Sequence, residues 1–256
     1  METIMKEIES TLASFEPISL SQMSGIKLMN RIDTKYMIDV RLLPKLLEKA
    51  KEDYFAQEID GSRMAYYRTL YFDTENAEMF TIHHNGRRTR QKLRIREYVE
   101  SNQRFLEVKN KNNKGRTKKV RISVPDEDVL AQDEARSFIE EKLNYGIERL
   151  SPRLRNYFYR VTLVNKAKTE RLTIDVNIKF RNCKTDLQNT FEHLCIVEVK
   201  QDGNMHSPFK DYLQCERVKR KGISKYCLGM VLTDDSLKRN RFKRKINYIK
   251  KMLKVA

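Results

Sequence analysis

RQKLRIREYVE, residues 90–100, and RFLEVKNK, residues 104–111, alternate charged and apolar side chains at every second position. A period of two is that of a β-strand whose two faces meet different surroundings. The cations of the first stretch share one face, at Arg90, Lys92, Arg94 and Arg96, and the other face carries Leu93, Ile95 and Val99. In the second stretch one face carries Phe105, Glu107, Lys109 and Lys111. The pattern predicts two successive strands, each with a basic face and an apolar face.

Further segments on both sides of this pair extend the sheet. Alternation or aromatic content predicts strands over 31–40, 65–73, 115–124, 157–165, 171–180 and 195–201. Over 171–180 the pattern places Leu172, Ile174, Val176 and Ile178 on one face. Helices are predicted over 41–52, 74–86, 126–149, 207–220 and 238–256. Since no linker rich in Gly, Ser or Pro interrupts the chain, we expect one domain over 1–236 and a basic helix over 237–256 packed on it.

Composition excludes several classes of protein. The 256 residues include 39% hydrophobic residues, with only 8 Gly and 5 Pro, which is typical of a folded globular chain. No apolar run approaches the roughly 20 residues of a membrane span, and the acidic N-terminal segment lacks the features of a signal peptide. The four cysteines show no C-x-x-C spacing, so we expect free thiols and a cytoplasmic location.

The positive charge is concentrated in two regions. The chain has a formal net charge of +17, and residues 87–121 hold 14 Lys and Arg against three acids. Residues 238–256 hold nine Lys and Arg and no acid. Two concentrated basic regions predict a polyanionic substrate or partner, which leaves nucleic acid, a membrane surface and polyphosphate-type ligands open.

The carboxylates within the basic strands narrow this choice. An open sheet with a flat basic face would suit nucleic acid, whereas a closed barrel with a polar interior would suit a compact polyanion. Glu107, Asp175 and Glu198 stand in phase with the cations of their strands. A metal–phosphate complex needs both signs, because Arg and Lys bind phosphate oxygens while carboxylates bind Mg²⁺ or Mn²⁺. We therefore expect an α+β fold: a closed antiparallel β-barrel, basic inside, with helices packed outside.

A set of short motifs, spread over most of the chain, resembles a known family. The motifs are DTKYMI (33–38), YFDT (71–74), KLRIRE (92–97), FLEVKNK (105–111), RVTL after Tyr159, LTIDVNI (172–178), IVEVK (196–200) and ISKY (223–226). In this order they resemble the VTC domain, the polyphosphate polymerase module of the CYTH-like triphosphate tunnel metalloenzymes. The resemblance runs from about residue 25 to about residue 232.

The resemblance implies roles for individual residues. The positions that match its phosphate-contacting and catalytic residues are Lys35, Arg94, Arg96, Lys109, Arg160 and Lys225. Further phosphate contacts are expected at Lys92 and Lys200, and on the next strand at Arg116 or Lys118. Glu198 matches the carboxylate that binds Mn²⁺ or Mg²⁺, with Asp175 and Glu107 as additional candidates. The early motif Arg31-x-Asp33-x-Lys35 replaces the Glu-x-Glu-x-Lys of many CYTH members, which favours the polymerase branch.

The implied activity is a phosphotransferase that builds polyphosphate from the γ-phosphate of ATP. One alternative is a triphosphatase of the same fold that hydrolyses inorganic triphosphate or nucleotides. An alternative of another class is a non-catalytic module that binds polyphosphate or RNA. No specific nucleic acid is expected, and the basic segment 238–256 is a candidate for contact with a membrane surface or a membrane protein.

Overall fold

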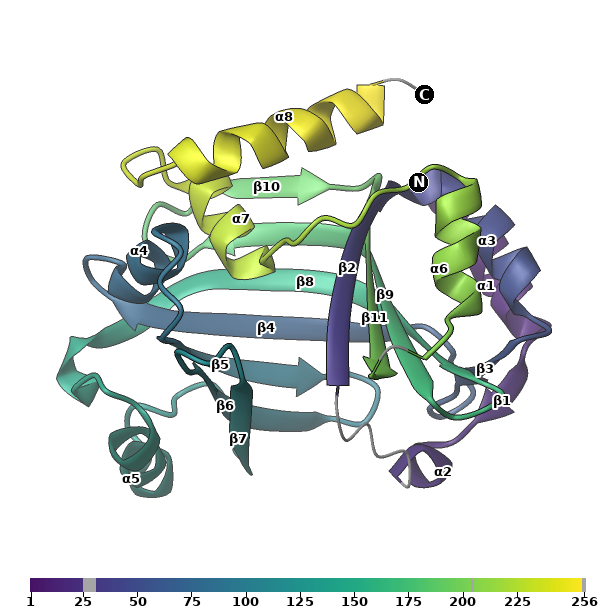
Figure 1. The fold of residues 1–256 in the computed structure, drawn as a ribbon. Helices are drawn as coiled ribbons and strands as arrows, with labels where there is room; N and C mark the ends of the chain where they lie inside the picture. Colours follow the sequence, from purple (N-terminus) through teal and green to yellow (C-terminus); the bar gives the residue numbers. More distant parts are fainter. Residues whose placement is uncertain (25–30, 204, 255–256) are drawn as a thin grey trace.

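A computed structural model describes residues 1–24, 31–203 and 205–254 (Figure 1). The expected start of the family resemblance, near residue 25, and the last two residues of the predicted C-terminal helix lie outside these ranges. The described chain is α+β, with one strongly curled sheet and helices around it. The helices are α1 (Glu2–Ala13), α2 (Leu20–Ser24), α3 (Leu43–Ala50), α4 (Glu78–His84), α5 (Asp133–Lys142), α6 (Pro208–Cys215), α7 (Lys225–Thr233) and α8 (Asn240–Lys254).

The sheet contains every strand that the alternation predicts, together with three short ones. Its strands are β1 (Glu16–Ile18), β2 (Arg31–Asp39), β3 (Tyr54–Gln57), β4 (Ala65–Thr74), β5 (Arg90–Tyr98), β6 (Gln103–Lys111), β7 (Thr117–Ser123), β8 (Leu150–Asn165), β9 (Glu170–Asn182), β10 (Gln188–Phe191) and β11 (Leu194–Asp202). Neighbours follow the order β2-β11-β9-β8-β4-β5-β6-β7, and all of these pairs are antiparallel.

The curled sheet is a half-barrel over the described residues, which do not show the closure that the sequence predicts. Over the ranges given above, β2 and β7, at the two ends of the order, do not pair with each other. Part of the free edge of β2 is occupied by the segment before α7, because the backbone N–H of Lys221 donates to the carbonyl of Lys35 at 2.7 Å. The edge strand β7 carries Lys118, Lys119 and Arg121, and such charge discourages edge-to-edge pairing.

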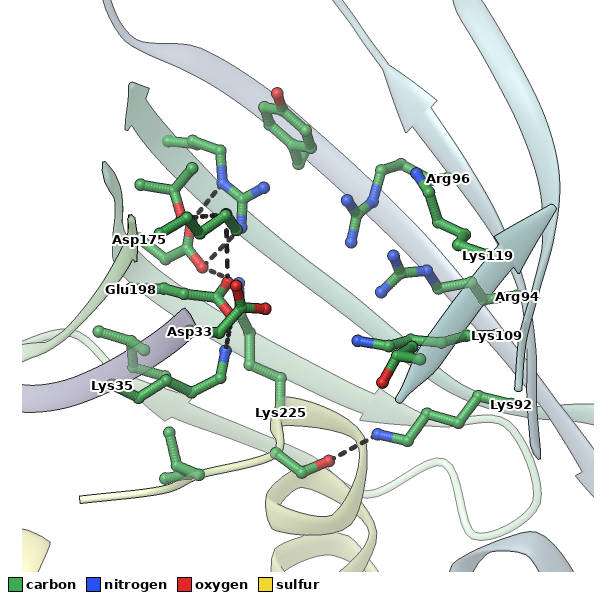
Figure 2. Close-up of a pocket in the computed structure, with 18 of the residues that line it drawn as sticks. Asp33, Lys35, Lys92, Arg94, Arg96, Lys109, Lys119, Asp175, Glu198 and Lys225 are labelled. Carbon is green, nitrogen blue, oxygen red and sulfur yellow. Dashed lines mark hydrogen bonds and ion pairs between the residues drawn. The ribbon is translucent and has the colours of Figure 1, made fainter. Parts of the chain in front are cut away.

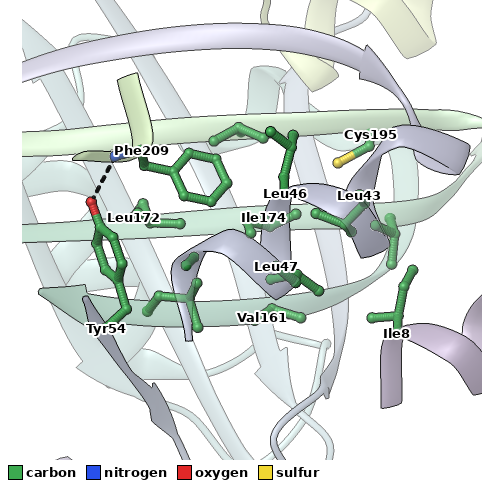
Figure 3. Close-up of a cluster of buried hydrophobic side chains, with 14 of the residues drawn as sticks. Ile8, Leu43, Leu46, Leu47, Tyr54, Val161, Leu172, Ile174, Cys195 and Phe209 are labelled. Carbon is green, nitrogen blue, oxygen red and sulfur yellow. Dashed lines mark hydrogen bonds between the residues drawn. The ribbon is translucent and has the colours of Figure 1, made fainter. Parts of the chain in front are cut away.

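The outer face of the sheet is apolar and covered by helices, as predicted. Helices α1, α3 and α6 pack on the outward side chains of β2, β8, β9 and β11, and Figure 3 shows this cluster with Leu46, Val161 and Ile174 at its centre. Helix α5 packs with the outward side chains of β5 and β6, which include Leu93 and Leu106. Because both outer clusters are buried, the opposite, charged faces of these strands must line the inside of the curl.

Helix α7 differs from the other helices because it fills one end of the inner side. Its Tyr226 packs on Tyr71 of β4 with 4.9 Å between ring centroids, and Leu154 and Phe180 belong to the same buried cluster. No pattern in the sequence predicts this helix. It is short and buried on nearly every side, so it lacks the amphipathic period by which surface helices are recognised.

Gly229 allows α7 to approach the sheet closely. A Cβ at this position would lie 2.6 Å from both Leu154 Cδ2 and Phe180 Cδ1. We expect Gly229→Ala to destabilise the fold by about 1–3 kcal/mol through overpacking, which corresponds to a fall in Tm of about 2–12 °C. Gly222→Ala is the matched control for thermal unfolding, since a Cβ there meets nothing within 4 Å. Equal melting temperatures for the two variants would contradict this account of the packing.

The helices predicted over 41–52, 74–86, 126–149 and 207–220 are all shorter in the structure, as α3, α4, α5 and α6. The helix predicted over 126–149 is confined to α5, because the Asp126 side chain accepts from the backbone N–H of Asp128 and from Gln132 and so holds a turn before the helix. At its other end Gln91 donates to the carbonyl of Lys142 at 3.0 Å. The helix predicted over 207–220 ends at Cys215.

Two strand predictions also need correction. β8 begins seven residues before the predicted 157–165, at Leu150, and Pro152 is accommodated next to a register shift between β4 and β8. In β9 the residue Asn177 has φ +50° beside a second register shift. This bulge separates Ile178, which packs in the α7 cluster, from Leu172 of the outer cluster, although the alternation places both on one face.

Within the described ranges no helix combines the length and apolar character needed to cross a bilayer.

Candidate active site

The inner side of the half-barrel encloses a cavity of about 1400 Å³. Seventeen of its lining residues are Lys or Arg, and three are Asp or Glu. Figure 2 shows two walls facing each other across it. The mixed wall, from β2, β9, β11 and the start of α7, carries Asp33, Lys35, Asp175, Glu198 and Lys225. The basic wall, from β5, β6 and β7, carries Lys92, Arg94, Arg96, Lys109 and Lys119. Such an excess of cations needs an anionic ligand.

On the mixed wall Glu198 lies between two lysines. Lys35 on the neighbouring β2 contacts Glu198 Oε1 at 2.6 Å, and Lys200 lies 3.4 Å from Oε2. Burial alone would raise the pKa of Glu198, but Lys200 and Lys35 outweigh it and hold the pKa below its ordinary value. Glu198 is therefore an ionised carboxylate that faces the cavity.

Asp175 is a second carboxylate of the mixed wall, and both of its oxygens are paired with cations. Arg160 donates from Nε to Oδ1 at 2.6 Å and from a terminal nitrogen to Oδ2 at 2.9 Å, and Lys225 of α7 also contacts Oδ2. Asp175 is only 3% exposed. Burial raises its pKa, yet Arg160 and Lys225 together bring the pKa below the ordinary range. Asp175 thus holds two cavity cations in place.

The third predicted carboxylate, Glu107, lies behind the basic wall. It is fully buried, and Arg94 contacts its Oε2 at 2.6 Å while Lys119 contacts its Oε1 at 2.9 Å. Against the effect of burial, Arg94, Arg96 and Lys119 bring the pKa of Glu107 below its ordinary value. Both oxygens of Glu107 are occupied, so its role here is to orient Arg94 and Lys119.

Other cations of the basic wall have no carboxylate partner among the described residues. Arg96 Nε is buried without a hydrogen-bond partner, and burial and the neighbouring Arg94 lower the pKa of its guanidinium. Burial, assisted by nearby cations, lowers the pKa of both Lys92 and Lys109 to about 8. Lys92 donates to the Ser224 hydroxyl at 3.0 Å. These groups are held close together in the absence of a counter-charge, which is the electrostatic arrangement of a polyanion site.

The lowered pKa values predict opposite pH trends for binding and stability. We expect the affinity for inorganic triphosphate to fall as the pH rises above about 8, because Lys92 and Lys109 lose their protons there. Between pH 8 and 10.5 the unfolded chain binds more protons at these lysines, so their contribution makes the unliganded protein more stable as the pH rises. Calorimetric titration and thermal unfolding at constant ionic strength measure both trends. An affinity that stays constant from pH 7 to 9.5 would contradict the first.

The structure brings ten of the thirteen predicted site residues together at the cavity, and Glu107, behind the basic wall, is one of the three that do not line it. Lys35, Lys92, Arg94, Arg96, Lys109, Arg160, Asp175, Glu198, Lys200 and Lys225 all line the cavity. Arg116 and Lys118 are exposed and do not line it. From β7 the cavity receives Lys119 and Arg121, which pair in register with Lys109 and Glu107. The turn before β7 left the register undetermined in the sequence, and pairing β7 against the inward face of β6 would have found these two residues.

The donor set is compatible with a divalent metal ion that is shared with a substrate. Within the described ranges no three His, Cys, Asp or Glu side chains are grouped as a metal cage. Mg²⁺ and Mn²⁺ are commonly held by one or two carboxylates together with substrate phosphates. Glu198 also contacts Lys35 and Lys200, but its side chain is 18% exposed to the cavity and fits such a shared site. The side chains of Asp175 and Glu107 are only 5% and 0% exposed and are enclosed by their cations.

The curled α+β sheet with a basic interior and helices outside is the class of fold that the sequence predicts. The VTC domain model matches residues 30–233, and the chain belongs to the VTC domain family, as the resemblance implies.

Three solved structures are similar to this chain. A putative adenylyl cyclase from Hippeastrum, described as having a dominant triphosphatase activity, is similar with a TM-score of 0.50 and 14% identity over 79% of this chain and 96% of that one. A putative adenylate cyclase from Bacillus halodurans has a TM-score of 0.47 and 14% identity over 84% of this chain and 100% of that one. One from Vibrio parahaemolyticus has a TM-score of 0.47 and 13% identity over 79% and 99%. A search of curated protein sequences finds no match.

Proposed function

We propose that this protein is a metal-dependent phosphotransferase that adds the γ-phosphate of ATP to a growing polyphosphate chain inside the cavity. The observation that carries the proposal is the basic wall, where Arg96 and Lys109 have no carboxylate partner in the described chain and face the ionised Glu198 across the cavity. Membership of the VTC domain family supports it.

The proposed step needs little chemistry from the side chains. A terminal phosphate oxygen of the chain attacks the γ-phosphorus of ATP, and a P–O bond forms between them. The bond from the γ-phosphorus to the β–γ bridging oxygen breaks, and ADP leaves with that electron pair. The attacking oxygen is already ionised, so no base has to remove a proton. Arg94, Arg96 and Lys109 neutralise non-bridging oxygens, and catalysis is by positioning and by stabilisation of charge.

In this proposal Glu198 would hold a Mn²⁺ or Mg²⁺ ion together with phosphate oxygens of the substrate. The ion would neutralise charge that develops on the transferred phosphoryl group. Lys35 and Lys200 keep Glu198 ionised and oriented, and Asp175 keeps Arg160 and Lys225 directed into the cavity.

A triphosphatase of the same fold is the second candidate, and the site supports it less well. Hydrolysis by general-base catalysis requires a carboxylate that is free to take a proton from water. Every carboxylate that lines the described part of the cavity is ion-paired: Asp33 with Arg31, Asp175 with Arg160 and Lys225, and Glu198 with Lys35 and Lys200. A phosphate acceptor does not need such a base. The third candidate, a non-catalytic polyanion-binding module, requires the cations alone.

One incubation separates the three candidates. The purified protein is incubated with ATP and Mn²⁺, and both polyphosphate on a stained gel and free phosphate in solution are measured. We expect long chains with little free phosphate. Free phosphate without chains would identify a triphosphatase. If neither product forms but polyphosphate binds in a salt-sensitive manner, the protein is a binding module.

Replacement of Glu198 tests the proposed metal contact. We expect Glu198→Ala to abolish polyphosphate formation while polyphosphate binding is kept or strengthened, because Lys35 and Lys200 gain freedom to bind phosphate. Glu198→Gln keeps the side-chain volume and guards against a folding defect. Glu192→Ala is the control, since this carboxylate is exposed in the turn before β11. If Glu198→Ala retained full activity, Glu198 would not be the metal contact.

The proposal includes two further expectations, one about the location of the protein in the cell and one about what helix α8 contacts. A cytoplasmic location agrees with Cys183, Cys195, Cys215 and Cys227, which are all free. Helix α8 buries Phe242 and Ile249 against the α7 cluster and exposes Arg241 and Lys243. We propose that this exposed basic face contacts polyphosphate or an anionic membrane surface, and that the cavity has no specific nucleic acid as ligand.

A further inference from the structure

The two ends of the cavity offer different chemistry. The register of β5 and β6 gives the order of inward-facing pairs along the basic wall. From one end to the other the pairs are Arg90 with Lys111, Lys92 with Lys109, Arg94 with Glu107, Arg96 with Phe105, and Tyr98 with Gln103. The wall is thus cationic at one end and aromatic at the other, and the change falls at Arg96.

The aromatic end contains a continuous set of rings that line the cavity. Tyr67 lies 5.0 Å from Tyr98 between ring centroids, and Tyr98 meets Phe105 edge to face at 5.8 Å. The guanidinium of Arg121 lies over the Phe105 ring at 4.2 Å from its centroid. Neither Phe105 nor Arg121 is buried. A stacked Phe–Arg pair presents a flat cationic surface, and planar bases stack on both aromatic rings and guanidinium planes.

The opposite end is enclosed by helices and provides positive charge. Lys92 contacts Ser224 at the start of α7, and Lys245 of α8 lines the cavity together with Lys111. From residue 90 to residue 98 the wall spans about 26 Å at 3.3 Å per residue. That length exceeds one triphosphate group, so a donor and a polyanionic acceptor can lie end to end.

From this polarity we infer that Phe105 and Arg121 form the subsite for the nucleobase of the donor nucleotide, while the end at Lys111 and Lys245 holds the inorganic polyphosphate chain. The inference rests on the proposed function, since it assigns orientation and specificity within the same cavity. By register Arg96 lies level with Phe105 and Arg94 level with Arg121, beside the base subsite. Lys92 and Lys109 are the next pair along the wall toward Lys111, where the phosphates of the nucleotide would meet the chain end. The base adds affinity for the nucleotide over inorganic triphosphate.

Binding of two ligands to variants of Phe105 tests the assignment. ATP and inorganic triphosphate are titrated calorimetrically into the protein with EDTA present, so that no turnover occurs. We expect Phe105→Leu, which removes the ring but keeps an apolar side chain, to weaken ATP binding about 5- to 150-fold, as for loss of one base–aromatic stack. Binding of inorganic triphosphate should stay unchanged. Phe105→Tyr keeps the ring and should retain the affinity for ATP.

A variant at the other end supplies the reciprocal control. We expect Lys245→Ala to weaken binding of long-chain polyphosphate and to leave ATP affinity unchanged. If Phe105→Leu weakened ATP and triphosphate equally, or neither, the base subsite would be refuted while the proposed function stood. If the wild-type protein bound neither ATP nor triphosphate, the proposed function itself would fail. A loss of ATP affinity in Lys245→Ala as large as in Phe105→Leu would refute the polarity.

Discussion

Arg96→Gln is expected to lower kcat/KM for polyphosphate formation by about 10²–10³-fold without lowering Tm. The reason is that Arg96 has no carboxylate partner in the described chain, and its close cations Arg94 and Arg160 repel it. Its charge therefore serves a ligand and opposes the unliganded fold. Steady-state kinetics and thermal unfolding of the same preparation measure the two effects.

Arg94→Gln and Arg68→Gln are the comparisons for this prediction. Loss of Arg94 leaves the fully buried Glu107 with Lys119 as its one remaining ion-pair partner, so this variant should lose both activity and stability. Arg68, on the other face of β4, is exposed, and its replacement should change neither property. A fall in Tm for Arg96→Gln as large as that for Arg94→Gln would contradict the argument.

The largest expected loss of stability is that of Asp175→Asn. This substitution keeps the size of the side chain but removes the charge that holds Arg160 and Lys225 together in the cavity wall. Breaking a buried ion pair costs about 3–5 kcal/mol, so we expect Tm to fall by about 6–20 °C. Inorganic triphosphate should raise the Tm of this variant more than that of the wild type, because the ligand supplies the missing negative charge.

Asp186→Asn is the matched control. Asp186 contacts Arg181 at 2.6 Å on the surface, and its side chain is 70% exposed, so the loss of this pair should cost at most about 1 kcal/mol. If the two variants melted at the same temperature, the cations of the cavity would not depend on Asp175.

The site residues that the sequence could predict are those whose direction, into the cavity or away from it, follows from the two-residue period of a strand. Arg94, Arg96 and Lys109 fall in phase on β5 and β6, and the apolar alternate residues identify the covered face. The period could not be carried across the turn before β7, where Gly115 has φ +80° and the number of turn residues decides which β7 side chains face inward. Arg116 and Lys118 were therefore predicted where the cavity has Lys119 and Arg121.

Other differences between the prediction and the structure arise from tertiary packing, which cannot be inferred from a local sequence pattern. The bulge at Asn177 changes the phase within β9, and α7 is identified by its burial against Leu154 and Phe180 and not by an amphipathic face. Whether the sheet closes depends on contacts between β2 and β7, which are distant in the chain. The sequence therefore predicts the strands and the sign of the cavity's charge, whereas closure of the sheet cannot be derived from a local pattern.

The pairing of β2 with β11 also determines when the site can form during synthesis. Lys35 pairs with Glu198, which is made roughly 160 residues later. At about 5–20 residues per second, β2 leaves the ribosome roughly 8–30 s before its only long partner strand in the described chain has been made. Joining such distant strands is slow, because the entropy of closing the loop is lost before the contacts form. We therefore expect the mixed wall to assemble after the basic wall, so that the nascent chain carries its basic wall before the carboxylate that completes the site.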